Sequence, residues 1–298
     1  MTLRPRLAAV SPIALALLLL LGASAPRARL GIELHPRHKP LTLDPELAHR
    51  DLALHGDGIA LAGWLFPAQG SPTGFTVVFL HGVGDNRAAS VELARLLVPM
   101  GFDVVAYDGR AHGESTGDAC TYGFREKRDL SLVLDQLGAR RAILIGCSLG
   151  AEIALQAAAD DPRVAGVLAS ASFADLRSVV HERAPRAATS AQVEKALAAA
   201  EADGSFDASR VSPVLAAERI RVPVLLVHGE RDPWTRVAHA RRILEALGGP
   251  KRLLVVDGAG HDVPLAPLWE DVEAWLAEVT GAPLPQRAPG PEPFGSGG

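Results

Sequence analysis

Apolar and polar residues alternate with two different periods along the chain. Between residues 52 and 65 the period is two, and Asp57-Gly58 interrupts it as a turn pair, which predicts a β-hairpin. From residue 75 onward, short apolar runs alternate with longer stretches of helical spacing. The predicted strands cover residues 75–80, 103–107, 142–145, 164–169, 222–227 and 253–256, and the predicted helices cover residues 91–100, 130–137, 151–159, 238–247 and 268–279. Strands that alternate with helices predict an α/β fold, in which helices cover both faces of a mostly parallel central sheet.

One long segment interrupts this alternation. Residues 173–214 contain no strand-like run, and residues 189–202 form a charged stretch rich in good helix formers. An insertion without strands between two core strands predicts a small helical cap. An ordinary long crossover connection would have the same pattern, and the sequence alone leaves that alternative open.

The N-terminal segment has a different character from the rest of the chain. Arg4 and Arg6 precede an uncharged apolar run at residues 7–25, which lacks the polar face of a helix that covers a core. This pattern predicts a signal peptide or a single membrane anchor within residues 1–30. Ala23-Ser24-Ala25 has the form of a cleavage site, whereas Pro26 directly after it favours an uncleaved anchor. Basic residues on both sides of the run leave its orientation open.

The remaining boundaries follow from composition. Residues 31–50 are rich in proline and basic side chains and are expected to form a linker, which places the folded domain at residues 51–281. Residues 282–298 are rich in proline and glycine without an apolar period, and they are expected to form a disordered tail. We therefore expect one domain that is either anchored to a membrane through the N-terminal segment or exported after cleavage.

Composition excludes several classes of partner and cofactor. The formal net charge is −4 and no basic block is present, so the chain lacks the electrostatic footprint of a nucleic-acid-binding protein. The two cysteines, Cys120 and Cys147, form neither a disulfide framework nor a zinc motif. No histidine pair at helical or strand spacing accompanies a carboxylate, so we expect no metal and no cofactor.

The strongest chemical signal is Gly146-Cys147-Ser148-Leu149-Gly150, which fits the pattern G-x-S-x-G. On its own the pattern is weak, because a glycine-rich turn between a strand and a helix has the same letters. Here it follows one predicted strand directly and opens a predicted helix, which is the context of a nucleophile elbow. A serine at a helix N-terminus also has backbone N–H groups beside any negative charge that develops on its substrate.

Two further residues complete a catalytic constellation. Asp232 and His261 each follow a predicted strand, so that the chain order is serine, aspartate, histidine at the carboxyl edge of the sheet. A neutral imidazole can remove a serine proton near neutral pH, and a carboxylate fixes the imidazole tautomer. We predict Ser148 as nucleophile, His261 as general base and Asp232 as the acid that orients it. Asp257 and Asp262 are the competing acids, because they lie near the histidine in sequence.

A fourth element is His81-Gly82-Val83-Gly84, which follows the first buried strand. A loop at this place can supply one N–H group of an oxyanion hole, while the residue after the nucleophile supplies the other. We therefore predict Val83 and Leu149 as the oxyanion-hole donors. A plain glycine-rich turn is the alternative for the first of them.

Together these motifs resemble the α/β-hydrolase superfamily in its serine-hydrolase branch, and they are similar to the bacterial membrane-linked hydrolases described as serine aminopeptidase-like. The matching residues span about residue 52 to about residue 280: Asp57-Gly58, Gly63-Trp64, His81-Gly82-Val83-Gly84-Asp85-Asn86, Tyr107-Asp108-Gly109-Arg110-Ala111-His112-Gly113-Glu114-Ser115, the Ser148 motif, His228-Gly229-Glu230-Arg231-Asp232 and Gly260-His261. The family usually has glycine where this chain has Ala111. We interpret Asp108, Arg110 and His112 as structural loop residues rather than catalytic ones.

The resemblance implies acyl-transfer chemistry on a small-molecule substrate but does not select that substrate, because the fold hosts many reactions. We expect a carboxylic ester with a short or medium acyl group. Aminopeptidases, thioesterases and acyltransferases share the same triad, and an aminopeptidase would hold the substrate amine with acidic cap residues. The candidates for that role are Glu182, Glu194, Glu201 and Asp203. The alternative of a different class is a non-catalytic binding protein, which would usually lack one member of the triad.

Overall fold

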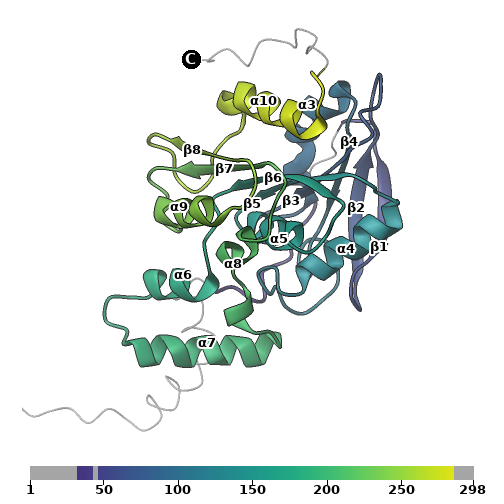
Figure 1. Cartoon of the computed structure of the whole chain (residues 1–298). Coiled ribbons are helices and arrows are strands. Elements are labelled where there is room, and N and C mark those ends of the chain that lie inside the picture. The colour runs from purple at the N-terminus through teal and green to yellow at the C-terminus, as the bar shows by residue number, and fades with distance from the viewer. Residues whose placement is uncertain (1–31, 43–45, 285–298) are drawn as a thin grey trace, which may run out of the picture.

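In the computed structural model, which describes residues 32–42 and 46–284, eight strands form one sheet in the order β1-β2-β4-β3-β5-β6-β7-β8 (Figure 1). Strands β3 to β8 pair in parallel, whereas β1 pairs antiparallel with β2 and β2 pairs antiparallel with β4. The strands are β1 (Arg50–His55), β2 (Ala60–Phe66), β3 (Thr76–Leu80), β4 (Asp103–Tyr107), β5 (Ala142–Cys147), β6 (Val164–Ser170), β7 (Val224–Gly229) and β8 (Lys251–Val256). The predicted α/β class with a mostly parallel sheet is confirmed.

Helices cover both faces of this sheet (Figure 1). On one face lie η1 (Arg87–Ser90), α3 (Val91–Leu97), η2 (Val98–Met100), η4 (Ala266–Leu268) and α10 (Trp269–Thr280), and on the other lie α4 (Glu126–Leu137), α5 (Leu149–Ala158), α8 (Pro213–Ala217) and α9 (Val237–Ala246). The side chains of β5 alternate between the two cores, because Leu144 packs on the α5 side while Ile143 and Ile145 pack on the α10 side. This double burial is the physical reason for the continuous apolar runs in the parallel strands.

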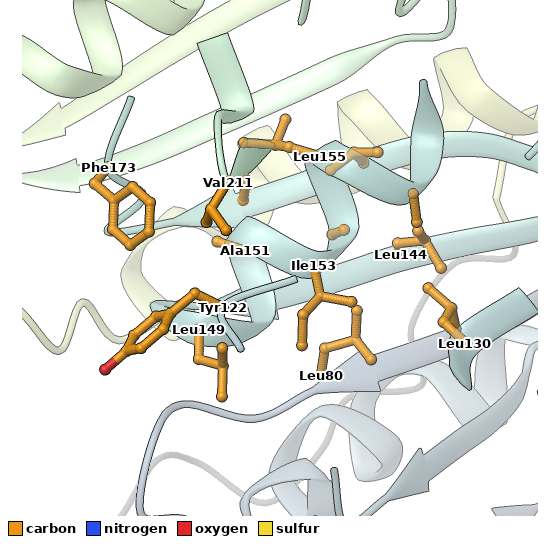
Figure 2. Packing of buried hydrophobic residues seen from close by; sticks show 14 of the residues in the cluster. Leu80, Tyr122, Leu130, Leu144, Leu149, Ala151, Ile153, Leu155, Phe173 and Val211 are labelled. Atoms are coloured by element: carbon orange, nitrogen blue, oxygen red, sulfur yellow. The ribbon is translucent and has the colours of Figure 1, made fainter. Parts of the chain in front are cut away.

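Helix α5 packs tightly against the middle of the sheet, as Figure 2 shows. Its side chains Leu149 and Ile153 join the same buried cluster as Leu80 of β3 and Leu144 of β5. Phe173, at the start of the cap, belongs to this cluster as well. The element that begins at the candidate nucleophile is therefore held on several sides by apolar contacts.

The segment without strand-like runs is helical. It contains α6 (Leu176–Arg183), α7 (Ser190–Gly204) and η3 (Ala208–Arg210), followed by α8. Thr189 and Gln192 form a capping box at the start of α7, in which each side chain accepts a backbone N–H of the other residue. In Figure 1, α6 and α7 lie beyond α8 and α9, away from the sheet. Residues 173–214 therefore have the helical content of the predicted cap.

The segment predicted as a linker is part of the folded domain where the structure describes it. Ile32 and Leu34 are only 2% and 3% exposed and belong to the core on the α5 side, whereas Glu33 and His35 are exposed. This alternation of buried and exposed residues is that of an extended chain with one face against the protein. Of the proline and basic residues that suggested a linker, Pro36 is buried as well, whereas residues 37–40 are exposed.

Both predicted terminal segments fall largely outside the described residues. These are the predicted signal peptide or anchor at residues 1–30 and residues 285–298 of the predicted tail. Within the described part of the chain, no helix combines the length and the apolar character that crossing a bilayer requires.

Candidate active site

Ser148 lies at the sharp turn between β5 and α5, in a backbone conformation that side chains rarely adopt. Its φ is 50° and its ψ is −117°. The two flanking glycines make this turn possible, because a Cβ on Gly146 would lie 2.2 Å from the carbonyl oxygen of Gly150. A Cβ on Gly150 would lie 1.9 Å from the carbonyl oxygen of Leu80 in β3. The sequence pattern G-x-S-x-G therefore corresponds to a strained turn that only glycine permits at both flanks.

The three predicted triad residues meet at the carboxyl edge of the sheet. His261 Nε2 lies 3.0 Å from Ser148 Oγ, and His261 Nδ1 lies 2.7 Å from Asp232 Oδ2. Both ring nitrogens are thus engaged, with the histidine between the hydroxyl and the carboxylate. The imidazole can accept the serine proton at Nε2 while Nδ1–H donates to the carboxylate.

Asp232 is surrounded by donors. Its side chain is fully buried, and Oδ1 accepts hydrogen bonds from the backbone N–H groups of Trp234 and Thr235 at 2.8 and 2.9 Å. Burial alone would raise the pKa of Asp232, but the hydrogen bonds from His261 and these amides outweigh it, and the pKa lies below its usual value of 3.8. The carboxyl is therefore ionised at neutral pH. Asp257 and Asp262, the competing acids, are exposed.

The acid loop and the histidine loop are in close backbone contact. A Cβ on Gly229 would lie 2.0 Å from the carbonyl oxygen of Gly260. The N–H of Arg231 donates to the carbonyl of Ala259 at 2.9 Å. This contact sets the distance between Asp232 and the histidine ring, because the two loops cannot separate without losing it.

The loop predicted to contribute to the oxyanion hole lies directly beside the nucleophile. A Cβ on Gly82 would lie 3.7 Å from Ser148 Cβ. The buried His81 side chain donates from Nδ1 to the carbonyl of Gly82 at 2.8 Å and accepts the N–H of Gly109 on Nε2 at 2.9 Å. The carbonyl of Gly82 and the N–H of Val83 belong to one peptide unit, so the histidine fixes the direction of that N–H.

Both predicted oxyanion donors are at suitable positions on their elements. Leu149 is the first residue of α5, and its N–H precedes the first intrahelical hydrogen bond. Burial lowers the pKa of His81, so the ring stays neutral and keeps its acceptor for Gly109. The two N–H groups thus come from a helix N-terminus and from a loop whose peptide is held by a neutral histidine.

Asp108, Arg110 and His112 form the scaffold of the next loop. Asp108 is fully buried and accepts the backbone N–H groups of Arg87 and Glu114 at 2.7 and 2.8 Å. Arg110 forms a bidentate ion pair with buried Asp129 at 2.7 and 2.8 Å. His112 donates to the carbonyl of Arg110, and burial lowers its pKa to about 4. These contacts agree with the structural interpretation of all three residues.

Ala111, which replaces the usual glycine, has a φ of 62°. This left-handed conformation costs an alanine on the order of 1 kcal/mol relative to glycine. The surrounding ion pairs and hydrogen bonds hold the loop in this conformation, and the Ser148, His261 and Asp232 geometry forms with alanine at this position.

The sequence did not single out two polar residues beside the site. Glu152 lies on α5 and is 1% exposed, and it accepts the N–H of Phe173 at 2.9 Å. Arg183, at the end of α6, donates from Nε to the carbonyl of Trp234 at 2.8 Å and from Nη2 to Thr235 Oγ1 at 3.0 Å. The available signal for Glu152 was a charged residue in a helix that otherwise carries no charge. Nothing in the sequence distinguished Arg183 from the other charged residues of the cap.

Among the residues that the structure describes, no group of three histidine, cysteine, aspartate or glutamate side chains has the arrangement of a metal site. Cys120 and Cys147 are free thiols, and burial raises the pKa of Cys147 to about 12.

Comparisons with known proteins agree with the observed fold. A family model described as alpha/beta hydrolase fold matches residues 76–212, and one described as TAP-like protein matches residues 199–268. The uncharacterised protein YqkD of Bacillus subtilis is 30% identical over 207 residues, which cover 62% of this chain and 64% of that protein. The chain therefore spans slightly less than two thirds of this relative's length.

A characterised relative and a solved structure extend the comparison. The 2,6-dihydropseudooxynicotine hydrolase of Paenarthrobacter nicotinovorans is 26% identical over 258 residues, which cover 83% of this chain and 68% of that enzyme. The structure of the Pyrococcus furiosus esterase Pf2001 superposes with a TM-score of 0.65 at 22% identity, covering 83% of this chain and 98% of the esterase. The second similarity is one of fold.

Proposed function

Because the chain belongs to the α/β-hydrolase superfamily, we propose that it is a serine hydrolase that cleaves carboxylic esters through an acyl-enzyme intermediate. The single observation that carries the proposal is the position of His261, whose two nitrogens lie within hydrogen-bond distance of Ser148 Oγ and Asp232 Oδ2. A serine with a base and an orienting acid is the arrangement that activates a hydroxyl for acyl transfer.

The proposed reaction has two steps. In the first, Ser148 Oγ attacks the ester carbonyl carbon while its proton moves to His261 Nε2, and the alcohol leaves with that proton. In the second, His261 accepts a proton from water, the resulting hydroxide attacks the acyl-serine, and the acid leaves as Ser148 regains its proton. The Val83 and Leu149 N–H groups stabilise the negative oxygen formed in each step. Asp232 stabilises the histidinium between proton transfers.

The acidic cap residues support an ester over a peptide substrate. An aminopeptidase would need a carboxylate that is available to a substrate ammonium group. Glu194 instead pairs with Arg177 and His181, and Asp203 pairs with His35. Glu201 accepts the N–H of Ala208. Glu182 lies 3.3 Å from His239 Nε2. All four candidates are engaged by neighbours within the chain, which favours ester hydrolysis as the proposed activity.

Labelling with a fluorophosphonate probe tests the proposal directly. The full-length chain should be labelled, and Ser148→Ala should abolish both labelling and ester hydrolysis while the circular dichroism spectrum stays unchanged. Loss of the nucleophile costs on the order of a million-fold in a triad enzyme. A folded Ser148→Ala protein that keeps more than a few per cent of wild-type activity would overturn the nucleophile assignment. An unlabelled wild-type chain would favour the alternative of a non-catalytic binding protein.

A substrate panel then separates the activities that share the triad. Hydrolysis of p-nitrophenyl esters should exceed hydrolysis of aminoacyl p-nitroanilides and of acyl thioesters at equal concentration. Faster turnover of the anilides would assign an aminopeptidase instead, and transfer of the acyl group to an added alcohol in place of water would assign an acyltransferase.

We further propose that the N-terminal segment attaches the chain to a membrane, with export after cleavage as the alternative. The apolar run at residues 7–25 carries both possibilities. Full-length protein that sediments with membranes and is released only by detergent would support the anchor. A shortened form recovered without detergent from outside the cytoplasm would instead support a cleaved signal.

A further inference from the structure

We propose that residues 32–42 form a strap that holds residues 82–86 in the conformation needed for catalysis, and that Lys39 and Asn86 are positioning residues. The first segment is called the N-terminal strap and the second the oxyanion loop. The proposal rests on the proposed function, because it assigns a role in stabilising the negative oxygen of an ester-hydrolysis intermediate. It is supported by contacts of the strap with the cap, with the connection between β4 and α4, and with the oxyanion loop.

One end of the strap is buried beneath the cap. Ile32 and Leu34 are almost fully buried and belong to the same cluster as the inward side chains of α7. A Cβ on Gly204, the last residue of α7, would lie 3.6 Å from Leu34 Cδ1. His35 Nε2 lies 3.1 Å from Asp203 Oδ2 in the same helix. This end is therefore fixed to the cap by both apolar and polar contacts.

Hydrogen bonds along residues 33–38 also fasten the strap to the connection between β4 and α4. The carbonyl of Leu34 accepts the N–H of Cys120 at 2.8 Å, and the N–H of Glu33 donates to Tyr122 Oη at 2.8 Å. Further along, His38 Nδ1 donates to the carbonyl of Gly113 at 2.7 Å. Bonds to backbone atoms fix the path of the strap, so that its far end arrives at a defined place.

The far end of the strap contacts the oxyanion loop through two side chains. Lys39 Nζ forms an ion pair with Asp85 Oδ1 at 2.7 Å. Asn86 is 2% exposed, and its Nδ2 donates to the carbonyl oxygens of Lys39 and Pro40 at 3.1 and 3.4 Å. Its Oδ1 accepts the N–H of Ala88 at 3.0 Å, which caps η1. The Nδ2 atom of Asn86 therefore binds the strap, while its Oδ1 atom stabilises the start of η1 directly after the oxyanion loop.

The oxyanion loop connects these strap contacts to the peptide unit that carries the Val83 N–H. The N–H of Asp85 donates to the carbonyl of Gly82 at 3.2 Å, and that carbonyl shares a peptide unit with the N–H of Val83. Gly82 itself lies against Ser148. An oxyanion donor acts on the transition state and must be placed within a few tenths of an ångström. A loosened loop should therefore lower kcat while KM changes little.

Asn86→Asp tests the role of the amide donor. The variant keeps the Oδ1 acceptor for Ala88 but places an oxygen against the two strap carbonyls. We expect kcat for a p-nitrophenyl ester to fall by about tenfold or more, with KM within about twofold, because partial misplacement costs less than loss of a donor. The rate of fluorophosphonate labelling should fall in parallel.

Lys39→Ala tests the ion pair at an exposed position where misfolding is not expected. Its matched control is Arg37→Ala, which removes the same charge from an exposed residue of the strap. We expect kcat to fall several-fold for Lys39→Ala, to recover in Lys39→Arg, and to stay at the wild-type value in Arg37→Ala.

Two outcomes would overturn the proposal, and they are distinguishable. If Asn86→Asp and Lys39→Ala both turn over ester at the wild-type kcat per folded molecule, with at most a lowered Tm, the strap is only structural and the Ser148 assignment stands. If the wild-type chain is not labelled at Ser148 at all, the proposed function fails and the strap proposal fails with it.

Discussion

The Nδ1 atom of His261 lies 2.7 Å from the Oδ2 atom of Asp232, although 29 residues separate the two in the chain. The two residues lie in the loops that follow the neighbouring parallel strands β7 and β8, whose carboxyl ends lie side by side. Close packing of Gly229 against the carbonyl of Gly260 then brings the two loops together. The carboxylate is held ionised by two backbone amides and the imidazole, so it can orient the ring and stabilise its charged form.

Substitution of the three aspartates should give a graded result. Asp232→Asn keeps the Oδ1 acceptor for the Trp234 and Thr235 amides but replaces the oxygen that accepts from His261 with a donor. Activity should fall on the order of ten-thousand-fold, because the wrong tautomer is favoured. Asp257→Asn and Asp262→Asn should keep most activity, since both residues are exposed. The measurement is ester hydrolysis by the purified variants near neutral pH. A larger loss in Asp257→Asn than in Asp232→Asn would refute the acid assignment.

Two glycine-to-alanine substitutions, on either side of the contact between the acid and histidine loops, should differ strongly in their effect on stability. Gly229→Ala places a methyl group 2.0 Å from the carbonyl oxygen of Gly260, so the loops must separate. We expect destabilisation by about 2 kcal/mol or more, and a large loss of activity from the displaced acid. Gly260→Ala meets no atom within 4 Å and should change stability by less than about 1 kcal/mol. Chemical denaturation of both variants checks the contrast, and equal effects would contradict the close approach.

Glu152→Gln should stabilise the protein in a pH-dependent way. Ser172 Oγ lies 3.2 Å from the carbonyl oxygen of Phe173 and 3.0 Å from Glu152 Oε2. The hydroxyl has one proton, so if it donates to the carbonyl, the carboxyl must donate to the hydroxyl and be protonated. Burial raises the pKa of Glu152 well above 4.5, because the hydrogen bonds to it and the charge of Arg183 do not outweigh the loss of solvation. Glutamine reproduces this protonated form with a permanent donor.

The direction of this pH dependence follows from the difference between the pKa of Glu152 in the folded and in the unfolded state. Above about pH 4.5 the unfolded chain ionises Glu152 while the folded state keeps its proton, so wild-type stability falls as pH rises towards the folded pKa. The gain in unfolding free energy from Glu152→Gln should be absent below about pH 4.5. Above that pH it should grow by up to about 1.4 kcal/mol per pH unit. Unfolding free energies measured between pH 4 and pH 9 test this, with exposed Glu278→Gln as the matched control. A constant difference across the range would show that Glu152 is charged in the folded protein.

Arg183→Ala should reduce turnover without removing a member of the triad. The guanidinium joins the cap to the acid loop by donating to the Trp234 carbonyl and to Thr235 Oγ1, and the amides of the same two residues hold Asp232. Loss of these bonds should loosen the acid loop and lower kcat by about tenfold. Arg186→Ala removes the same charge from an exposed position after α6 and serves as the control. Equal steady-state parameters for the two variants would exclude this role of Arg183.

Acyl chain length should have an optimum at short or medium chains. The aromatic side chains of residues 173–214 are Phe173 and Phe206, which are 3% and 7% exposed because they pack into the core. They leave little apolar cap surface to hold a long chain, so binding should not improve with every added methylene. Values of kcat/KM across p-nitrophenyl esters from acetyl to palmitoyl check this. A steady rise to palmitoyl would contradict it.

The chain's local patterns determined the fold class and the sharp turn on which Ser148 lies. Continuous apolar runs predict strands buried on both faces, and β5, with Leu144 facing one core and Ile145 the other, has that burial. The glycines around Ser148 predict the elbow, because the turn has room for nothing larger at either flank. Such features depend on neighbours within a few residues, and a sequence displays them directly.

Contacts between distant segments were decided only by the tertiary structure. Residues 32–42 have the composition of a linker, yet Ile32 and Leu34 are buried, because α7 and the loop after β4 offer them an apolar surface. The choice of Asp232 over Asp257 depends on where two loops touch, and the burial of Glu152 depends on Ser172 and Phe173 in a following loop. Local sequence does not encode which remote surface a side chain will meet, because that surface exists only once the strands have paired and the helices have packed.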